Sequence, residues 1–278
     1  MSDPALNQFA ELARLEDARL RLDAAVIEIA RLAYPGLDTG HWLAVLDELA
    51  RRAAPLIAAA DDPLGFVGGL NRALFEAERF RGDETDYYDP RNSFLNEVLE
   101  RRIGIPITLS VVYMEVARRL GHQVEGIGFP GHFLVRATVG GRFLHLDPFH
   151  AGRVVTALEC QERLDRSFKS PVQLDPRFLD PVGARAIVTR ILHNLKEIYL
   201  RRRDQAHGLA VAERLILLLP GDASEVRDRG KVLLALGERQ RGARDLEAYL
   251  DGAPAGAPDR EEVRALLVGI RKRQALVN

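Results

Sequence analysis

The segment from residue 106 to residue 120 constrains the fold more than any other part of this 278-residue chain. Pro106 suits the first turn of a helix, where its missing backbone N–H removes no hydrogen bond. Before Arg118, Glu115 is the only charged side chain in the segment. A helix that is apolar on nearly every face must be buried. We therefore expect a central helix over residues 106–120, with the other elements packed around it.

The sequence after Gly121 predicts antiparallel strands. The runs 123–129, 131–139 and 142–148 are separated by Pro130-Gly131 and Gly140-Gly141, which are turn-forming pairs. A two-residue turn at Gly140-Gly141 fixes the register of a hairpin. The expected pairs are Val139 with Arg142, Ala137 with Leu144, Arg136 with His145, and Leu134 with Asp147.

This register sorts the side chains of the hairpin onto two faces. We expect the core face to carry Phe133, Val135, Ala137, Leu144 and Leu146, and the other face to carry His132, Arg136, His145 and Asp147. His132 and Asp147 are then diagonal neighbours, whose Cα atoms lie roughly 7–8 Å apart. Asp147 can accept the imidazole proton and fix its tautomer, as the orienting group of a catalytic triad does. A polar surface pair without chemistry is the open alternative.

Metal binding is a second alternative for the same residues. His132, His145, Asp147 and His150 are close in sequence and are suitable ligand types. The chain has no ligand-spaced motif such as His-Glu-x-x-His. We therefore expect neither a metal nor a cofactor.

The first ninety residues are predicted to be helical. One run is stopped by Pro35-Gly36, a second covers residues 41–54, and Asp62-Pro63 has the cap and proline of a third helix start. The apolar stripe of that third helix is Leu64, Val67, Leu70, Leu74 and Phe75.

From about residue 184 the pattern is helical again and repeats every 34 residues. Leu200, Gly208, Glu213, Ile216 and Pro220 recur as Leu234, Gly242, Glu247, Leu250 and Pro254, and Leu215 is matched by Tyr249. This period is that of tetratricopeptide (TPR) helix pairs. An ordinary helical bundle with a chance match is the alternative.

Composition narrows the classes of function. The 39 Lys and Arg nearly balance 40 Asp and Glu, so no net field attracts the chain to nucleic acid. No stretch of about 18 apolar residues is free of charge, which argues against a membrane span or a secretion signal. The single cysteine, Cys160, excludes an internal disulfide and a multi-thiolate zinc site. We expect a cytoplasmic protein.

Several motifs together resemble the transglutaminase-like superfamily, and more closely its bacterial SirB-type proteins. They are Arg102-Ile103-Gly104-Ile105-Pro106-Ile107 with the helix ending at Gly121, Phe129-Pro130-Gly131-His132-Phe133-Leu134, and Leu146-Asp147-Pro148. The resemblance covers about residues 40–270. It implies an α+β, papain-like core, in which a central helix packs on a small antiparallel sheet, followed by TPR-like helices. Accordingly we expect a helical N-terminal region at 1–90, the core at 91–183 and TPR-like repeats at 184–278.

The resemblance implies that His132 and Asp147 are the histidine and aspartate of the family's active site. Active members read Gly-x-Cys at the start of the helix, and counting back fifteen residues from Gly121 reaches Pro106. Proline supplies no nucleophile. As substitutes, Ser110 lies one turn too far along the helix, Thr108 points about 200° away around the axis, and Cys160 is expected to be a buried hydrophobe.

Two functions remain. The first is a non-catalytic regulatory or protein-binding module that uses the cleft and the TPR-like tail to bind a protein or peptide. The second is a hydrolase or transferase of altered mechanism, with His132 as general base and Asp147 orienting it. In either case we expect Arg136, His145 and Asn92 to take part in binding.

Overall fold

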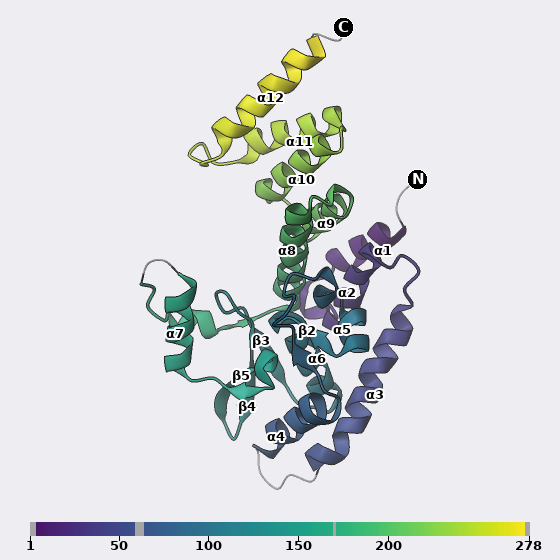
Figure 1. Cartoon of the computed structure of the whole chain (residues 1–278), viewed down its shortest axis with the longest axis vertical. Coiled ribbons are helices and arrows are strands. Elements are labelled where there is room, and N and C mark those ends of the chain that lie inside the picture. Colours follow the sequence, from purple (N-terminus) through teal and green to yellow (C-terminus); the bar gives the residue numbers. More distant parts are fainter. Residues whose placement is uncertain (1–3, 59–63, 169–170, 276–278) are drawn as a thin grey trace. The chain divides into compact units, whose positions relative to one another are not determined.

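The computed structural model describes residues 4–58, 64–168 and 171–275 (Figure 1). The chain divides into two compact units. One is Leu15–Ile191, and the other combines Met1–Arg14 with Leu192–Asn278. The first ninety residues therefore belong mostly to the same unit as the expected core, and the second unit begins close to the expected start of the repeats.

The unit Leu15–Ile191 mixes helices with a small sheet. Its α-helices are α2 (Leu22–Ile29), α3 (Thr39–Ala58), α4 (Gly65–Asn71), α5 (Leu95–Arg101), α6 (Pro106–Arg119) and α7 (Ala157–Ser167), and α8 (Ala184–Arg202) begins in it. Its shorter turns are η1 (Asp17–Arg19), η2 (Ala30–Leu32), the π-helical η3 (Arg72–Ala77), η4 (Pro90–Ser93), η5 (Pro148–His150) and η6 (Pro176–Leu179). Its strands are β1 (Arg81–Gly82), β2 (Ile103–Gly104), β3 (Val124–Ile127), β4 (Leu134–Val139), β5 (Arg142–Asp147), β6 (Arg153–Val154) and β7 (Pro181–Val182). The expected α+β class is confirmed.

Helix α6 is the central buried element that the sequence predicts. It begins at Pro106, and every residue from Pro106 to Ala117 is buried. The Thr108 hydroxyl ties down the start of the helix, because its Oγ1 accepts from Ile105 N at 3.1 Å and donates to Asn92 O at 2.7 Å. Two arginines in the last turn suit the negative end of the helix dipole.

The main sheet has five strands in the order β6-β5-β4-β3-β7, with every neighbouring pair antiparallel. Its β4–β5 hairpin has the predicted register, with Val139 opposite Arg142, Ala137 opposite Leu144, and Arg136 opposite His145. The core face also agrees, since Phe133, Val135, Ala137 and Leu146 are buried. Leu144 is only partly buried.

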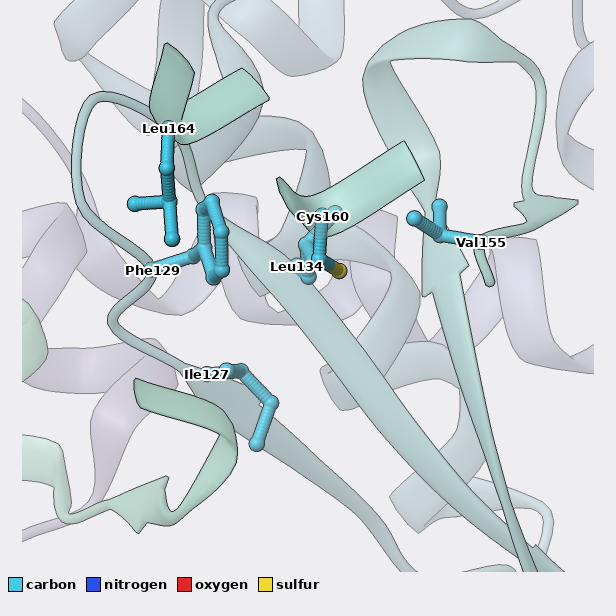
Figure 2. Packing of buried hydrophobic residues seen from close by; sticks show 6 residues of the cluster. All are labelled: Ile127, Phe129, Leu134, Val155, Cys160 and Leu164. Carbon is cyan, nitrogen blue, oxygen red and sulfur yellow. The ribbon is translucent and has the colours of Figure 1, made fainter. Parts of the chain in front are cut away.

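The other face of the hairpin is less open than the sequence analysis expected. Six buried residues from β3, β4, α7 and the loops beside them form one apolar cluster (Figure 2): Ile127, Phe129, Leu134, Val155, Cys160 and Leu164. Leu134 shares a face with Arg136 because side chains alternate along a strand. Helix α7 therefore covers the end of the face on which the polar side chains lie.

The N-terminal helices differ in detail from the prediction. The expected helix start at Asp62-Pro63 lies outside the described residues, and α4 begins at Gly65. Val67, Leu70 and Leu74 are buried as predicted, whereas Leu64 is 57% exposed. Leu64 precedes the first turn of α4 and so does not share its apolar stripe.

The second unit is entirely helical in its described part. It contains α1 (Pro4–Ala13), most of α8, α9 (Gln205–Leu218), α10 (Ala223–Ala235), α11 (Arg239–Gly252) and α12 (Arg260–Ala275). Helices α9 and α11 have the same length, and α11 starts 34 residues after α9. The period counted in the sequence is therefore the spacing of successive helix pairs.

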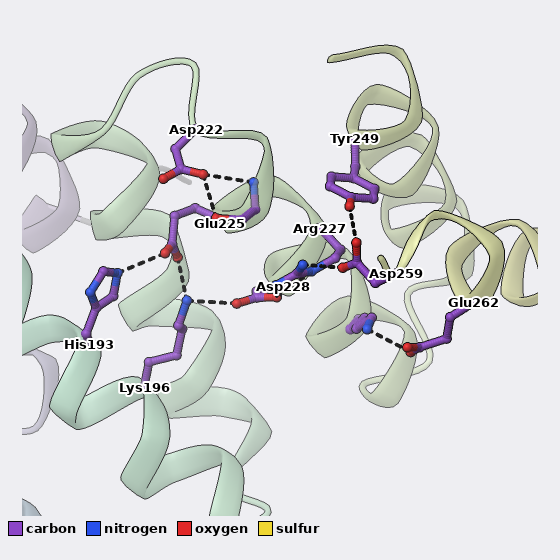
Figure 3. A network of polar contacts seen from close by, with 11 residues as sticks. His193, Lys196, Asp222, Glu225, Arg227, Asp228, Tyr249, Asp259 and Glu262 are labelled. Atoms are coloured by element: carbon purple, nitrogen blue, oxygen red, sulfur yellow. Dashed lines mark hydrogen bonds and ion pairs between the residues drawn. The ribbon is translucent and has the colours of Figure 1, made fainter. Parts of the chain in front are cut away.

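Charged side chains connect the helices of this unit (Figure 3). Glu225 on α10 accepts from His193 Nε2 at 2.9 Å and from Lys196 Nζ at 2.7 Å, both on α8. Asp259, just before α12, pairs with Arg227 on α10 and accepts from the Tyr249 hydroxyl on α11. Ion pairs of this kind fix which helix faces meet, in addition to the apolar contacts.

Substitution of Gly242 is expected to destabilise the fold. A Cβ there would lie 2.8 Å from the Leu234 side chain and 2.9 Å from Gly230 O. Gly242→Ala should therefore lower the free energy of unfolding by about 1–3 kcal/mol, the usual cost of overpacking. Urea unfolding measures this change. Gly252→Ala in the same helix is the control, because its Cβ would meet only Ala223 at an ordinary 3.8 Å; equal losses in the two variants would contradict the packing argument.

Candidate functional site

The structure brings His132 and Asp147 into direct contact. His132 lies just before β4 and Asp147 is the last residue of β5. Their Nε2 and Oδ1 atoms are 2.9 Å apart. The side chain of His132 is 10% exposed and that of Asp147 is 0% exposed. The hairpin register therefore carries a buried carboxylate to a nearly buried imidazole.

Asp147 has three further partners. Its Oδ2 lies 2.8 Å from His150 Nδ1 and accepts from an Arg163 guanidinium nitrogen at 2.5 Å. Its Oδ1 also accepts from Phe149 N at 3.2 Å. Arg163 comes from α7, sixteen residues further along the chain. Sequence reasoning missed Arg163, because no local pattern tells which way α7 faces, and it could not orient His150, because that residue lies in the turn after Pro148.

The loop after His150 is held by an N-terminal helix. Ala151 and Gly152 both have a positive φ, and Asn71 Nδ2 of α4 donates to Gly152 O at 2.9 Å. A Cβ on Gly152 would come within 2.1 Å of Asn71 Oδ1. Only glycine fits this position, because both the backbone angle and the space exclude a side chain.

These contacts set the protonation states of the site. Burial alone would raise the pKa of Asp147, but hydrogen bonds and charge from His132 and His150 outweigh it and lower that pKa to about 2. Burial lowers the pKa of His132, against the opposing effect of Asp147. An ionised carboxylate can only accept. His132 therefore keeps its proton on Nε2 when neutral, and Nδ1 carries the lone pair.

No nucleophile meets this imidazole within the part of the chain that the structure describes. Pro106 occupies the first position of α6. The Thr108 hydroxyl is engaged with the backbone of Asn92, and Ser110 is fully buried in the helix interior. No hydroxyl or thiol among the described residues hydrogen-bonds to the His132 ring.

Cys160 lies in the apolar cluster under α7. It is 1% exposed and packs among Phe129, Leu134 and Leu164 (Figure 2). Burial raises the pKa of its thiol above the ordinary value. A buried thiol of raised pKa is a poor nucleophile, in keeping with the expectation from sequence.

The three expected binding residues lie elsewhere than the His132 pocket. Arg136 binds Glu125 at 2.8 Å and stacks on Phe143. His145 faces Arg136 across the hairpin, and burial lowers its pKa. Asn92 is fully buried, and its side-chain amide bonds to Asp83, to the Asp86 carbonyl and to Arg101. Their role in binding stays a prediction.

His132 is reachable by a small ligand. It lines a surface pocket of about 380 Å³. Two rings border it: Phe149, in an edge arrangement with centroids 6.1 Å apart, and His150, with centroids 6.0 Å apart. Tyr87, from the turn-rich segment 87–92, contacts the Phe149 ring edge-on and is 41% exposed. The imidazole is therefore bordered by Phe149 and His150 and stays open on one side.

A metal ion would find three donors here. One ligand atom each from His132, Asp147 and His150 lies within 4.8 Å of the others. His145, the fourth residue of the metal hypothesis, is not in this group. Arg163 already holds the Asp147 carboxylate at 2.5 Å, so a divalent cation bound there would lie close to a guanidinium charge. The three donors are therefore of types that bind metal ions, but the positive charge of Arg163 opposes the binding of a cation.

Two family profiles account for most of the chain. The profile of the transglutaminase-like superfamily matches residues 40–193, and a tetratricopeptide repeat profile matches residues 195–268. The α+β fold of the first unit agrees with the first profile, and the 34-residue helix spacing of the second unit agrees with the repeat profile. The molecule is thus a transglutaminase-like domain followed by TPR helices, as the sequence motifs predict.

Similar proteins narrow the family to which this chain is assigned. A UPF0162 protein of Xylella fastidiosa is 37% identical over 88% of both chains, and one of Vibrio cholerae is 30% identical over 86% of both. Human F-box only protein 21 is 28% identical over 70% of this chain, which corresponds to 31% of its own length. No solved structure matches significantly. The chain belongs to the transglutaminase-like superfamily and, with the two bacterial relatives, to the UPF0162 family.

The buried charge of Asp147 makes stability depend on pH. Its folded pKa of about 2 lies below the ordinary aspartate value of 3.8, so the contribution of about 2 kcal/mol is present above pH 4 and is lost as the pH falls toward 2. Asp147→Asn should cost about 3 kcal/mol at pH 7, because Arg163 loses its carboxylate. That cost should shrink as the pH falls from 4 to 2. Urea unfolding across this range measures it, and the exposed Asp251→Asn should show no such trend.

Cys160 should be unreactive in the folded protein. At pH 8, iodoacetamide should label it only after unfolding in urea, because burial both shields the thiol and raises its pKa. Mass spectrometry of native and unfolded samples checks this. Rapid native labelling that disappears in His132→Ala would instead show a thiol working with the imidazole.

Proposed function

We propose that this protein is a non-catalytic binding protein. In this proposal the transglutaminase-like core keeps its pocket and its His132–Asp147 pair, and the TPR helices bind a protein or peptide partner. The observation that carries the proposal is the environment of His132: its imidazole is held by Asp147, and Pro106 begins the helix on which the family's thiol is expected. Without a nucleophile, the acid-base pair has no group to activate.

The tail supports the binding role. Residues 195–268 match a TPR profile, and stacked helix pairs of this kind present extended surfaces to protein partners. The formal net charge of −1 gives no general attraction to nucleic acid. Within the described residues, no helix has both the length and the apolar character that a membrane crossing needs. A lone buried thiol suits a reducing compartment, and we propose a cytoplasmic location.

A second candidate function rests on the tautomer of His132. Its Nδ1 lone pair is unprotonated at neutral pH, because burial lowers the pKa of the ring, and the ring borders a pocket. This arrangement suits a general base that takes a proton from water or from a substrate hydroxyl. The two functions differ in one respect that an experiment can measure, the turnover that depends on His132.

Turnover is the first test. Amide, ester and peptide substrates should be screened with the full chain, His132→Ala and the control His193→Ala, whose imidazole binds Glu225 in the tail. The proposal expects no turnover above background in any of the three. Turnover that vanishes in His132→Ala and persists in His193→Ala would establish the second candidate and remove the first.

Partner binding is the complementary test. The full chain, used as bait in an extract of its own cells, should retain a protein in stoichiometric amount. Hydrogen exchange of the purified complex should then slow within residues 195–268, where a TPR surface would be covered. A complex protected only within residues 40–193 would contradict the role given to the tail, and so would the absence of any retained protein.

A further inference from the structure

The pocket beside His132 is strongly basic. Besides Pro130 and Gly131, its lining consists of His132, His150, Arg153, Arg163, Arg166 and Ser167. No acidic side chain lines it. By contrast, the neighbouring pocket on the other side of His150 includes Asp83 and Glu84. The pocket beside His132 therefore has three arginines without an acidic lining residue, whereas its neighbour has two acidic side chains and one arginine, Arg81.

The three guanidinium groups differ in what holds them. Arg163 is paired with Asp147, and Arg153 is paired with Glu159 at 2.7 Å. Arg166 has no hydrogen-bond or ion-pair partner among the described residues. It is exposed, in the last turn of α7. Three arginine charges thus face two carboxylates that lie outside the lining, which leaves the pocket with an excess positive charge.

These donors suit one class of ligand. Guanidinium groups are planar forks that bind phosphate and carboxylate oxygens through paired hydrogen bonds. The Ser167 hydroxyl adds a donor that can rotate toward an oxygen. A volume of about 380 Å³ holds a small molecule rather than a polymer segment. Three arginines and a hydroxyl in so small a space match a group with several charged oxygens.

We propose that the pocket lined by Arg153, Arg163, Arg166 and Ser167 binds the phosphate group of a small phosphorylated ligand. The inference rests on the proposed binding role of the core and names its ligand chemistry. Free phosphate and a phosphate monoester share this chemistry. In either form the ligand lies against His132, so the family's acid-base position becomes part of an oxyanion site.

Calorimetric titration of the full chain tests the proposal, with inorganic phosphate, glycerol phosphate and malonate as separate ligands at constant ionic strength. Inorganic phosphate and glycerol phosphate should each bind at one site per chain, and malonate should bind more weakly. Tighter binding of glycerol phosphate than of phosphate assigns the natural ligand to the monoesters, and the reverse order assigns it to the free ion. No binding of either, or tighter binding of malonate, overturns the proposal.

Arg166 supplies the decisive variant, because its loss breaks no hydrogen bond or ion pair within the described residues. Arg166→Gln should weaken phosphate binding about tenfold, the worth of one charge-assisted hydrogen-bonding group. Arg142→Gln, which removes the same charge from an exposed residue outside the pocket, should change affinity less than twofold. Equal losses in both variants would reduce the effect to general surface charge and overturn the site.

Arg166 also stabilises the end of α7 through the helix dipole, so thermal unfolding of each variant is recorded. If Arg166→Gln does not fold, Arg166→Lys decides, since it keeps the charge but loses the planar fork and should still weaken binding severalfold. The result of the phosphate-binding test can be told apart from the results of the tests of the proposed function. His132-dependent turnover with phosphate binding intact removes the non-catalytic role alone, and a retained partner without phosphate binding removes the pocket alone.

Discussion

The buried carboxylate of Asp147 is the constraint on which the arrangement of the site depends. A charge with no exposure to water must find donors within the protein, or the folded state is heavily destabilised. Here the donors come from three elements: His132 before β4, the Phe149 amide and His150 of η5, and Arg163 of α7. Satisfying one carboxylate therefore fixes the hairpin, the turn after it and the helix that covers the sheet.

This constraint changes how the histidine–aspartate pair is interpreted. In a catalytic triad the aspartate orients an imidazole that activates a nucleophile. In this chain the same hydrogen bond also satisfies one oxygen of a buried carboxylate, so the pair has a structural task that does not require turnover. His132 and His150 share one carboxylate, and Arg163 lies between that carboxylate and the basic pocket. The electrostatic character of the cleft follows from how Asp147 is paired.

The sequence predicted those features that depend on local periodicity. The two-residue turn at Gly140-Gly141 placed His132 beside Asp147, and the 34-residue count located the helix pairs. The sequence could not predict that Arg163 joins the site or that α7 packs over Leu134. The face with which an amphipathic helix docks is decided by apolar partners that are distant in sequence. Arg136 and His145 share a strand pair as predicted, yet they do not line the pocket, since that pocket is built from the loop at 130–132, the turn at His150 and α7.

The hydrogen bond between Asn71 and Gly152 has a consequence for where the chain can be divided. A helix from the first ninety residues holds the left-handed turn that follows His150, so the geometry around the carboxylate is completed by a segment that contributes no chemistry of its own. Helices α2, α3 and α4 thus belong to the same compact unit as the site, whereas α1 belongs to the other unit. Cutting the chain at the change of composition near residue 90 would therefore divide a single compact unit, residues 15–191, and would separate Asn71 from the turn that it holds.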